Sequence, residues 1–157
     1  MNTDAALRYF TSHGIPVHKL VLGIPLYGRS FLACNGPGAP FSGVGQGSWE
    51  AGTYDYKALP LPGAVERVDT NAVAASCFEP NKREWVSYDT VSSATSKAAF
   101  VNQNNLAGAM YWELSGDRND EGSIVKAVAH VFGQIDARPN CLDYSASKFD
   151  NMRNGMK

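Results

Sequence analysis

The chain has 157 residues, of which 44% are hydrophobic and 18% are charged, and its formal net charge at pH 7 is −1. This composition is typical of one globular domain and excludes an intrinsically disordered chain. The near-neutral charge gives no basic surface for nucleic acid and no polybasic signal for a membrane, and no apolar run approaches the ~20 residues of a membrane-spanning helix.

The start of the sequence, MNTDAALRYF, has no basic segment followed by an apolar core, so it predicts no secretory leader. Taken literally, the chain would be a cytosolic product. If it is a fragment of a longer precursor, the lack of a leader here carries no information about export.

The three cysteines, Cys34, Cys77 and Cys141, are widely spaced and odd in number. No CxxC occurs, and the histidines share no ligand spacing with the cysteines, so we expect no metal site. One disulfide can be drawn but not assigned. We therefore predict buried free thiols, which behave as small apolar side chains.

The first predicted elements are a helix, a short loop and a buried strand. The helix runs from Asp4, its predicted N-cap, to about Ser12, and Gly14 and Pro16 end it. Residues 20–26 form a continuous apolar run, which is typical of a strand buried on both faces in a parallel sheet flanked by helices. This order predicts an α/β unit.

The middle of the chain has a different character. Residues 32–64 are rich in glycine and proline and predict an ordered, turn-rich segment or the start of an inserted subdomain. They lack the GxxxxGK[ST] pattern of a phosphate-binding loop, which argues against nucleotide binding. Residues 83–90 alternate, with Val86 and Tyr88 on one side and Trp85 on the other, so they predict an antiparallel strand.

The last part returns to the first pattern. Residues 92–105 predict a helix with Ser92 or Ser93 as its N-cap and one apolar stripe formed by Ala94, Ala98 and Val101. The stretch AGAMYWEL, residues 107–114, predicts a second buried strand. A final helix is predicted over Ile124–Phe132, with Gly133 as its stop. The whole order predicts an α/β fold with an α+β insertion.

Polar and aromatic side chains stand at the carboxyl ends of both buried strands, where sites form in parallel α/β folds. Tyr27 and Arg29 follow the first strand, and Trp112 and Glu113 end the second. An indole gives a flat face for a pyranose ring, while a phenol and a guanidinium bond to its oxygens. The combination indicates a sugar site. Taken singly, Tyr27 could pack with its hydroxyl on backbone, Arg29 could form an ion pair, and Trp112 could belong to the core.

Four stretches of the sequence carry a specific family resemblance. KLVLGIPLYGRSF (Lys19–Phe31) and GAMYWEL resemble the seventh and eighth barrel strands of the family 18 glycoside hydrolases, the chitinases. GVGQGSWEAGTYDYKALP resembles the α+β insertion domain of fungal members, and LDYSASKFDNMRNGMK resembles the C-terminal tail of secreted fungal endochitinases. The resemblance covers essentially the whole chain and implies a partial TIM (β/α)8 barrel with its last two strands and helices.

The resemblance implies a division of the chain and a set of roles. Residues 1–31 would be a barrel segment with the seventh strand, 32–91 the α+β insertion domain, 92–133 a barrel segment with the eighth strand, and 134–157 the C-terminal tail. The site residues would be Tyr27 and Arg29 lining the cleft, Trp112 under the sugar, and Glu50 reaching from the insertion. Trp49 is a weaker candidate, and the resemblance gives Glu113 no catalytic role.

The resemblance also shows what the chain lacks. The family's general acid is the glutamate of a DxxDxDxE motif, and neither that motif nor the family's MxYD motif occurs. In this substrate-assisted reaction the acetamido oxygen attacks the anomeric carbon while the glutamate protonates the leaving oxygen. The acidic stretch DRNDE, residues 117–121, has the wrong spacing and is interpreted as solvated charge at the start of the last helix. We assign no catalytic residue, no metal and no cofactor.

Three hypotheses follow. The chain could be the C-terminal part of a chitinase, inactive without the N-terminal half of the barrel, and extracellular in the full-length family member. It could instead be a non-catalytic protein that binds chitin or chitooligosaccharide. It could also be a plain α/β domain with these aromatic residues in its core. The first is preferred. Two strands cannot close a barrel, so we also expect the chain to be marginally stable or prone to aggregation by itself.

Overall fold

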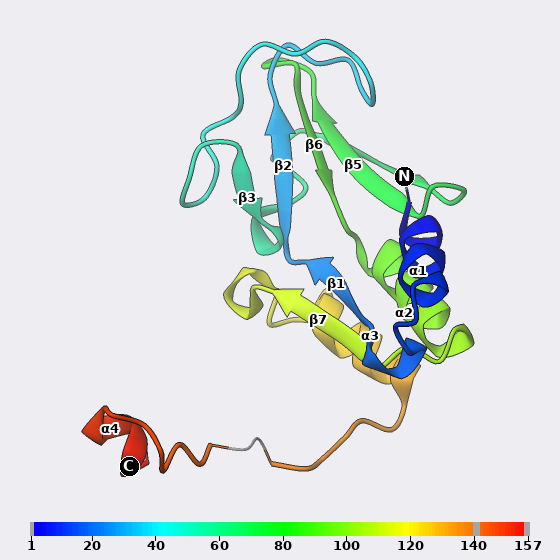
Figure 1. The fold of residues 1–157 in the computed structure, drawn as a ribbon. Helices are drawn as coiled ribbons and strands as arrows, with labels where there is room; N and C mark the ends of the chain where they lie inside the picture. Colours follow the sequence, from blue (N-terminus) through cyan, green and yellow to red (C-terminus); the bar gives the residue numbers. More distant parts are fainter. Residues whose placement is uncertain (1, 140–141, 156–157) are drawn as a thin grey trace.

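The computed structural model describes residues 2–139 and 142–155. It contains a two-stranded parallel sheet of order β1-β7 and a five-stranded antiparallel sheet of order β3-β2-β6-β5-β4, which we call the insertion sheet. The insertion sheet rises from the end of β1, and the helices α2 and α3 lie behind the β1–β7 pair (Figure 1). The elements in chain order are α1 (Thr3–Ser12), η1 (Val17–Lys19), β1 (Val21–Pro25), β2 (Tyr27–Phe31), β3 (Thr53–Asp55), η2 (Tyr56–Ala58), β4 (Val65–Asp69), β5 (Ala74–Glu79), β6 (Glu84–Tyr88), α2 (Val91–Gln103), β7 (Gly108–Trp112), η3 (Leu114–Gly116), α3 (Ile124–Phe132) and α4 (Asp150–Arg153).

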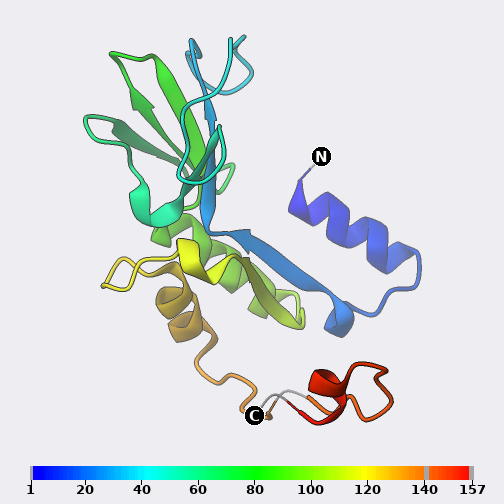
Figure 2. The same ribbon diagram turned by 90° about the vertical axis from the view of Figure 1, so that its left-hand side faces the viewer.

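The first helix forms where predicted but has a different N-cap. The side chain of Asn2, not of Asp4, accepts the hydrogen bond from the backbone N–H of Ala5, at 2.9 Å. Asp4 instead pairs with Arg8 one turn later, at 2.9 Å. No residue of α1 is buried, and the helix stands apart from α2 and α3 (Figure 2).

The β1–β7 pair is covered on one face only. Val21 lies opposite Gly108 and Pro25 opposite Trp112 in a parallel register. Ile24 is 1% exposed and belongs to the core cluster that α2 and α3 complete. On the other face Val21 is 54% exposed and Met110 49%. The prediction of strands buried on both faces is therefore met on one face only. A closed barrel would bury the other face against strands across its interior, and within the described ranges the pair is a sheet of two strands.

Within the apolar run of residues 20–26, the backbone passes from one sheet to the other at Leu26. The N–H of Leu26 donates to the carbonyl of Trp112 at 2.8 Å, whereas its own carbonyl accepts from the N–H of Tyr56 at 2.9 Å. The backbone thus leaves the β1–β7 pair, and residues 27–31 form a separate strand, β2, between β3 and β6. The strand predicted over residues 20–26 thus forms as β1, and residues 27–31, which follow it, belong to the insertion sheet. The division of the chain into domains stays a prediction.

The insertion sheet has one packed face and one open face. Val86 and Tyr88 are buried, as the alternation in this segment predicts, and Leu59 packs against the same side. Trp85 lies on the open side, paired with Phe31 of β2. The β4–β5 hairpin was not predicted, because short side chains such as those of residues 74–77 give a weak strand signal.

The two later helices begin and end close to their predicted positions. Thr90, not Ser92 or Ser93, caps α2, and it forms a capping box in which Ser93 bonds back to the Thr90 N–H. Ala94, Ala98 and Val101 are buried as predicted. The helix α3 spans the predicted residues and ends at Gly133, whose φ of 70° suits glycine.

The acidic stretch after β7 is less solvated than predicted. Asp117 accepts hydrogen bonds from the Ser123 hydroxyl at 2.7 Å and from the N–H groups of Ile124 and Val125 at 3.0 and 3.1 Å. Asp117 therefore accepts hydrogen bonds from backbone N–H groups in the first turn of α3 that have no partner within the helix. The interpretation of Asp117 as solvated charge is wrong, whereas its predicted place at the start of the last helix is confirmed.

Cys34 and Cys77 are free and buried, which confirms the predicted thiols at these two positions. Cys141 lies outside the described residues. Over the described ranges, acidic, histidine and cysteine side chains form no cluster that could hold a metal ion. No helix in this part of the chain is long and apolar enough to cross a bilayer.

Candidate functional site

The four predicted site residues come from three segments. Tyr27 and Arg29 lie on β2, Glu50 lies in the loop between β2 and β3, and Trp112 ends β7. Tyr27 and Arg29 alternate with the buried Gly28, so both project from the open face of the insertion sheet.

Gly28 explains how β2 can lie so close to the packed layer. A Cβ at this position would stand 2.7 Å from the side chains of both Leu59 and Val86. Any larger residue would push β2 away from the core and would move Tyr27 and Arg29 with it.

Arg29 is the centre of the candidate site. Its guanidinium donates to the Thr53 hydroxyl at 2.7 Å and lies 3.4 Å from Glu50 Oε1. The Thr53 hydroxyl in turn donates to Glu50 Oε1 at 2.8 Å. The guanidinium carbon lies 5.2 Å from the ring centroid of Tyr27. Tyr27, Arg29 and Glu50 are therefore in one contiguous group.

This group is open to water. The Arg29 and Glu50 side chains are 57% and 68% exposed. An ion pair this exposed contributes about 0–1 kcal/mol to stability. The alternative that Arg29 serves mainly to form a stabilising ion pair is therefore energetically weak. Its remaining N–H donors are available to a ligand.

A hollow of about 500 Å³ lies beside the group, on the open face of the sheet. This volume is within the ~300–1,000 Å³ range of small-ligand sites. The residues around it include Tyr27, Arg29, Phe31, Trp85, Asp89 and Lys97. The rings of Phe31 and Trp85 are 5.8 Å apart and give an apolar wall. Lys97 and Asp89 form an ion pair of 2.6 Å at its edge.

Tyr88 also borders this hollow. Its burial and its hydrogen bond to the Glu66 carboxylate raise the pKa of the phenol. Tyr88 therefore stays protonated across the physiological range with its one proton donated to Glu66, so it is neither a free donor nor a general base for a ligand in the hollow.

Trp112, at the end of β7, is not among the residues that line the hollow. Trp112 stands opposite Pro25 of β1, and Pro25 comes two residues before Tyr27 in the chain. The peptide bond between Trp112 and Glu113 is cis. Its indole is 67% exposed, so the core alternative for Trp112 is wrong. The structure therefore joins three of the four predicted residues directly and leaves the indole as a separate exposed surface at the strand end.

Three other polar or aromatic residues lie near the candidate site or were considered for it. Trp49 is 85% exposed, and its indole N–H donates to Asp55 at 3.1 Å, which supports its role as a loop anchor. Glu113 accepts a hydrogen bond from the Ser115 hydroxyl. Sequence reasoning missed Thr53, because only the pairing of Arg29 with Thr53 across β2 and β3 brings it into the site.

Comparisons with known proteins point to one family. The profile of Glycosyl hydrolases family 18 matches residues 1–117. Endochitinase 1 of Metarhizium robertsii is 42% identical over 155 residues, which cover 99% of this chain and 37% of the relative. The chain thus spans 37% of the length of that fungal relative.

Two solved structures have the same fold over most of the chain. A mutant of the class V chitinase from Nicotiana tobaccum, in complex with NAG4, has a TM-score of 0.74 at 25% identity and covers 83% of this chain and 39% of its own. Human YKL-39, described as a pseudo-chitinase with retained chitooligosaccharide binding properties, has a TM-score of 0.74 at 32% identity, over 85% and 40%.

These likenesses confirm the predicted α/β class and the partial TIM barrel, since the β1–β7 pair and its helices match proteins of that fold without closing a barrel. The family profile covers well over half of the residues. The chain belongs to family 18 of the glycosyl hydrolases.

Proposed function

We propose that this chain supplies sugar-binding residues to a chitin-hydrolysing barrel. Tyr27, Arg29, Glu50 and Trp112 would contact β-1,4-linked N-acetylglucosamine units. The observation that carries the proposal is the contact of Arg29 with both Tyr27 and Glu50 on an open face that continues a barrel strand. The complex of the tobacco relative with NAG4 supports the choice of ligand.

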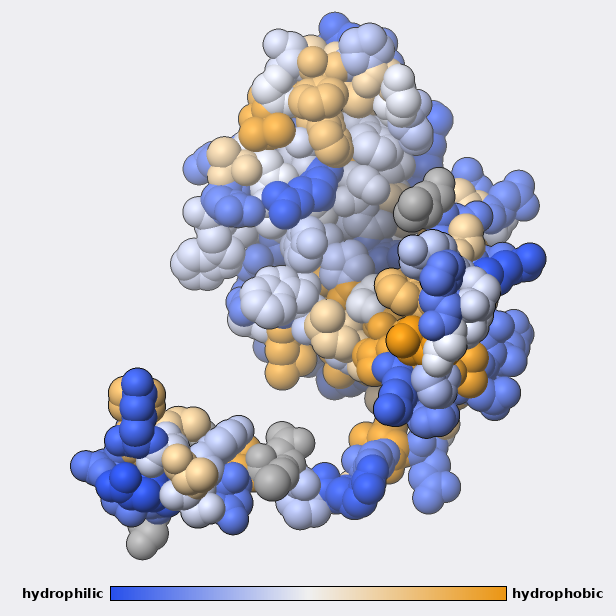
Figure 3. Space-filling model, viewed as in Figure 1, coloured by the Kyte–Doolittle hydropathy of each residue, from blue (hydrophilic) through white to orange (hydrophobic). Residues whose placement is uncertain are grey.

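We propose further that the chain does not cleave this ligand unaided. The sequence contains no DxxDxDxE motif, so it has no family acid to protonate the leaving oxygen in the retaining, substrate-assisted reaction. The acid and the other strands would come from the rest of a family 18 barrel, on a longer polypeptide or a separate one. Exposed apolar side chains over the β1 region fit such a partner (Figure 3).

The second candidate is a non-catalytic binding protein for chitin or chitooligosaccharide. The likeness to YKL-39 favours it, because that protein is described as a pseudo-chitinase that retains chitooligosaccharide binding. Both candidates need the same sugar-binding residues and differ only in whether a catalytic half completes the barrel. In both, the polysaccharide ligand fits the extracellular location expected for the full-length family member.

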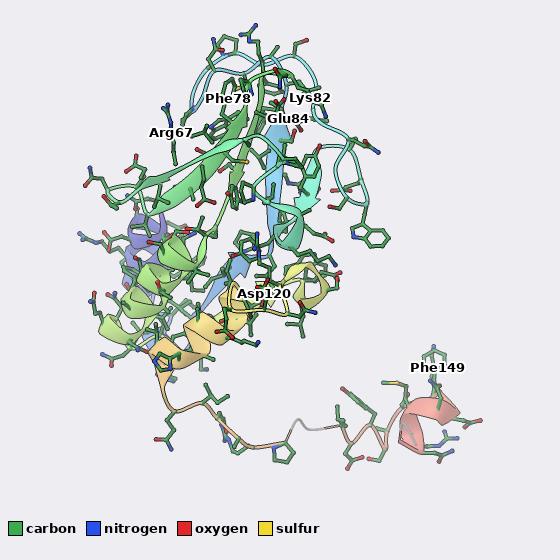
Figure 4. The ribbon with its side chains drawn as sticks, turned by 180° about the vertical axis from the view of Figure 1, so that it is seen from behind. Arg67, Phe78, Lys82, Glu84, Asp120 and Phe149 are labelled. Carbon is green, nitrogen blue, oxygen red and sulfur yellow. The ribbon has the colours of Figure 1, made fainter. Side chains whose placement is uncertain are left out.

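The site is tested by replacing Arg29 with alanine. Loss of its charged donors should weaken chitotetraose binding about tenfold, since hydrogen bonds of charged groups are worth about 1.5–3 kcal/mol. Isothermal titration calorimetry of both proteins measures this change. Arg67→Ala is the matched control, because Arg67 is on β4 at the opposite edge of the same sheet from β3 (Figure 4). Equal affinities of wild type and Arg29→Ala would contradict the assigned site.

A further inference from the structure

A buried carboxylate lies beneath the candidate site and is not used by the proposed function. Glu84, on β6, is 1% exposed, and the salt bridges found among the described residues do not include it. Its Oε1 accepts a hydrogen bond of 2.6 Å from the hydroxyl of Ser30, which is also 1% exposed. Burial of a carboxylate is costly unless its oxygens are hydrogen-bonded. Figure 4 shows Glu84 in the upper part of the insertion sheet.

Through Ser30, this carboxylate is connected to the loop that carries Glu50. The Ser30 hydroxyl accepts a hydrogen bond of 2.9 Å from the N–H of Gly45. The Ser30 N–H donates to the carbonyl of Gly52 at 2.9 Å, and the N–H of Gly52 donates to the carbonyl of Gly45 at 2.7 Å. Ser30 therefore fixes the loop on both sides of Glu50, at Gly45 and at Gly52.

The loop also lies closer to Glu84 than a side chain would allow. A Cβ on Gly45 would overlap the Glu84 carboxylate and stand 2.7 Å from the Ser30 hydroxyl. The phenol of Tyr54, just after the loop, has a raised pKa, chiefly because it is buried and in part because of the nearby Glu84 carboxylate. The loop is thus packed against this carboxylate at Gly45.

We infer that Glu84 is a positioning residue: through Ser30 it holds residues 45–52 in the conformation that places Glu50 against Arg29. This inference deepens the proposed function and rests on it, because the position of the loop matters for binding only if Glu50 contacts the sugar. Thr53 follows the same loop and joins Glu50 to Arg29, so a shift of the loop would separate all three. The competing explanation is that Glu84 stabilises the sheet without affecting the loop.

Amide hydrogen exchange of the full chain decides between these explanations without any ligand. Glu84→Ala and Ser30→Ala should each accelerate exchange over residues 44–54 about tenfold, because a lost hydrogen bond favours local opening. Glu84→Gln should restore protection, because its amide oxygen can still accept from Ser30. If Glu84→Ala does not fold, Ser30→Ala, which loses a single oxygen, carries the test.

Glu79→Ala is the matched control. Glu79 is 7% exposed on the adjacent β5, and it accepts hydrogen bonds from the N–H groups of Asn81 and Lys82 rather than from the loop. Its loss should open the turn at residues 80–82 and leave residues 44–54 protected. Unchanged exchange of residues 44–54 in Ser30→Ala, or equal acceleration in Glu79→Ala, would overturn the positioning role.

A double-mutant cycle on chitotetraose binding adds the functional readout. Glu84→Ala should weaken binding about tenfold in the wild-type background and much less on top of Glu50→Ala, because both changes disrupt the same group of Glu50, Thr53 and Arg29. Equal losses in both backgrounds would show that Glu84 does not act through Glu50. If the wild-type chain binds no chitotetraose, the proposed function fails, while the exchange experiment still decides the positioning of the loop.

Discussion

Incubated with a fluorogenic chitooligosaccharide, the 157-residue chain is expected to release no fluorophore above the buffer rate. General acid catalysis is worth about 10²–10⁴-fold, and this chain has no family acid to supply it. Its remaining residues would hold the acetamido sugar but leave the glycosidic oxygen unprotonated. Fluorescence against time, with and without the chain, is the measurement. Turnover by the purified chain would contradict the assignment of no catalytic residue.

Hydrolysis should appear when the chain is mixed or co-expressed with a polypeptide that carries the preceding barrel strands and the DxxDxDxE motif. The corresponding part of Endochitinase 1 from Metarhizium robertsii, at 42% identity to this chain over the shared region, is a suitable source. The uncovered face of the β1–β7 pair exposes Val21 and Met110, and the added strands would bury this apolar surface. A folded, mixed barrel without activity would favour the non-catalytic binding protein.

Trp112→Ala is expected to weaken chitotetraose binding about thirtyfold. A sugar ring stacked on the indole removes on the order of 100 Å² of apolar surface from water, worth about 2 kcal/mol. Titration calorimetry measures the loss, and Trp112→Phe should recover part of it because a smaller flat ring remains. Because Trp112 is 67% exposed, its truncation removes little core packing, so the loss of affinity reports the lost sugar contact.

Leu114→Ala is the control for Trp112. Leu114 is 69% exposed on the same rim, two residues further along, and it has no assigned contact with sugar. Its replacement should change the affinity less than about twofold, as is usual for surface substitutions. A similar loss of binding in both variants would mean that the rim, rather than the indole, determines affinity.

Elements with a strong local pattern were predictable from the sequence. The helices α2 and α3 and the strand β6 have clear periodicity, and their observed bounds lie within a few residues of the predicted ones. The N-caps were less predictable, because several residues with capping side chains stand together, as Thr90 and Ser93 do. Only the hydrogen bonds of the folded chain select one of them.

Features that depend on distant partners were not predictable. The apolar run through Leu26 is unbroken, so nothing local indicates that its backbone changes sheets there. Tyr27 and Arg29 were identified from their place after a buried strand, but Glu50 was found only through the family resemblance. Thr53 and Glu84 became visible only with the register of β2 against β3 and β6.

The most direct test of a sugar-binding surface without catalysis is one calorimetric titration of the chain with chitotetraose and with cellotetraose, followed by mass analysis of the recovered sugars. The account predicts saturable binding of chitotetraose, binding of cellotetraose weaker by about tenfold because it lacks the acetamido oxygens, and both sugars intact. Equal affinities, no binding of chitotetraose, or shortened products would contradict it.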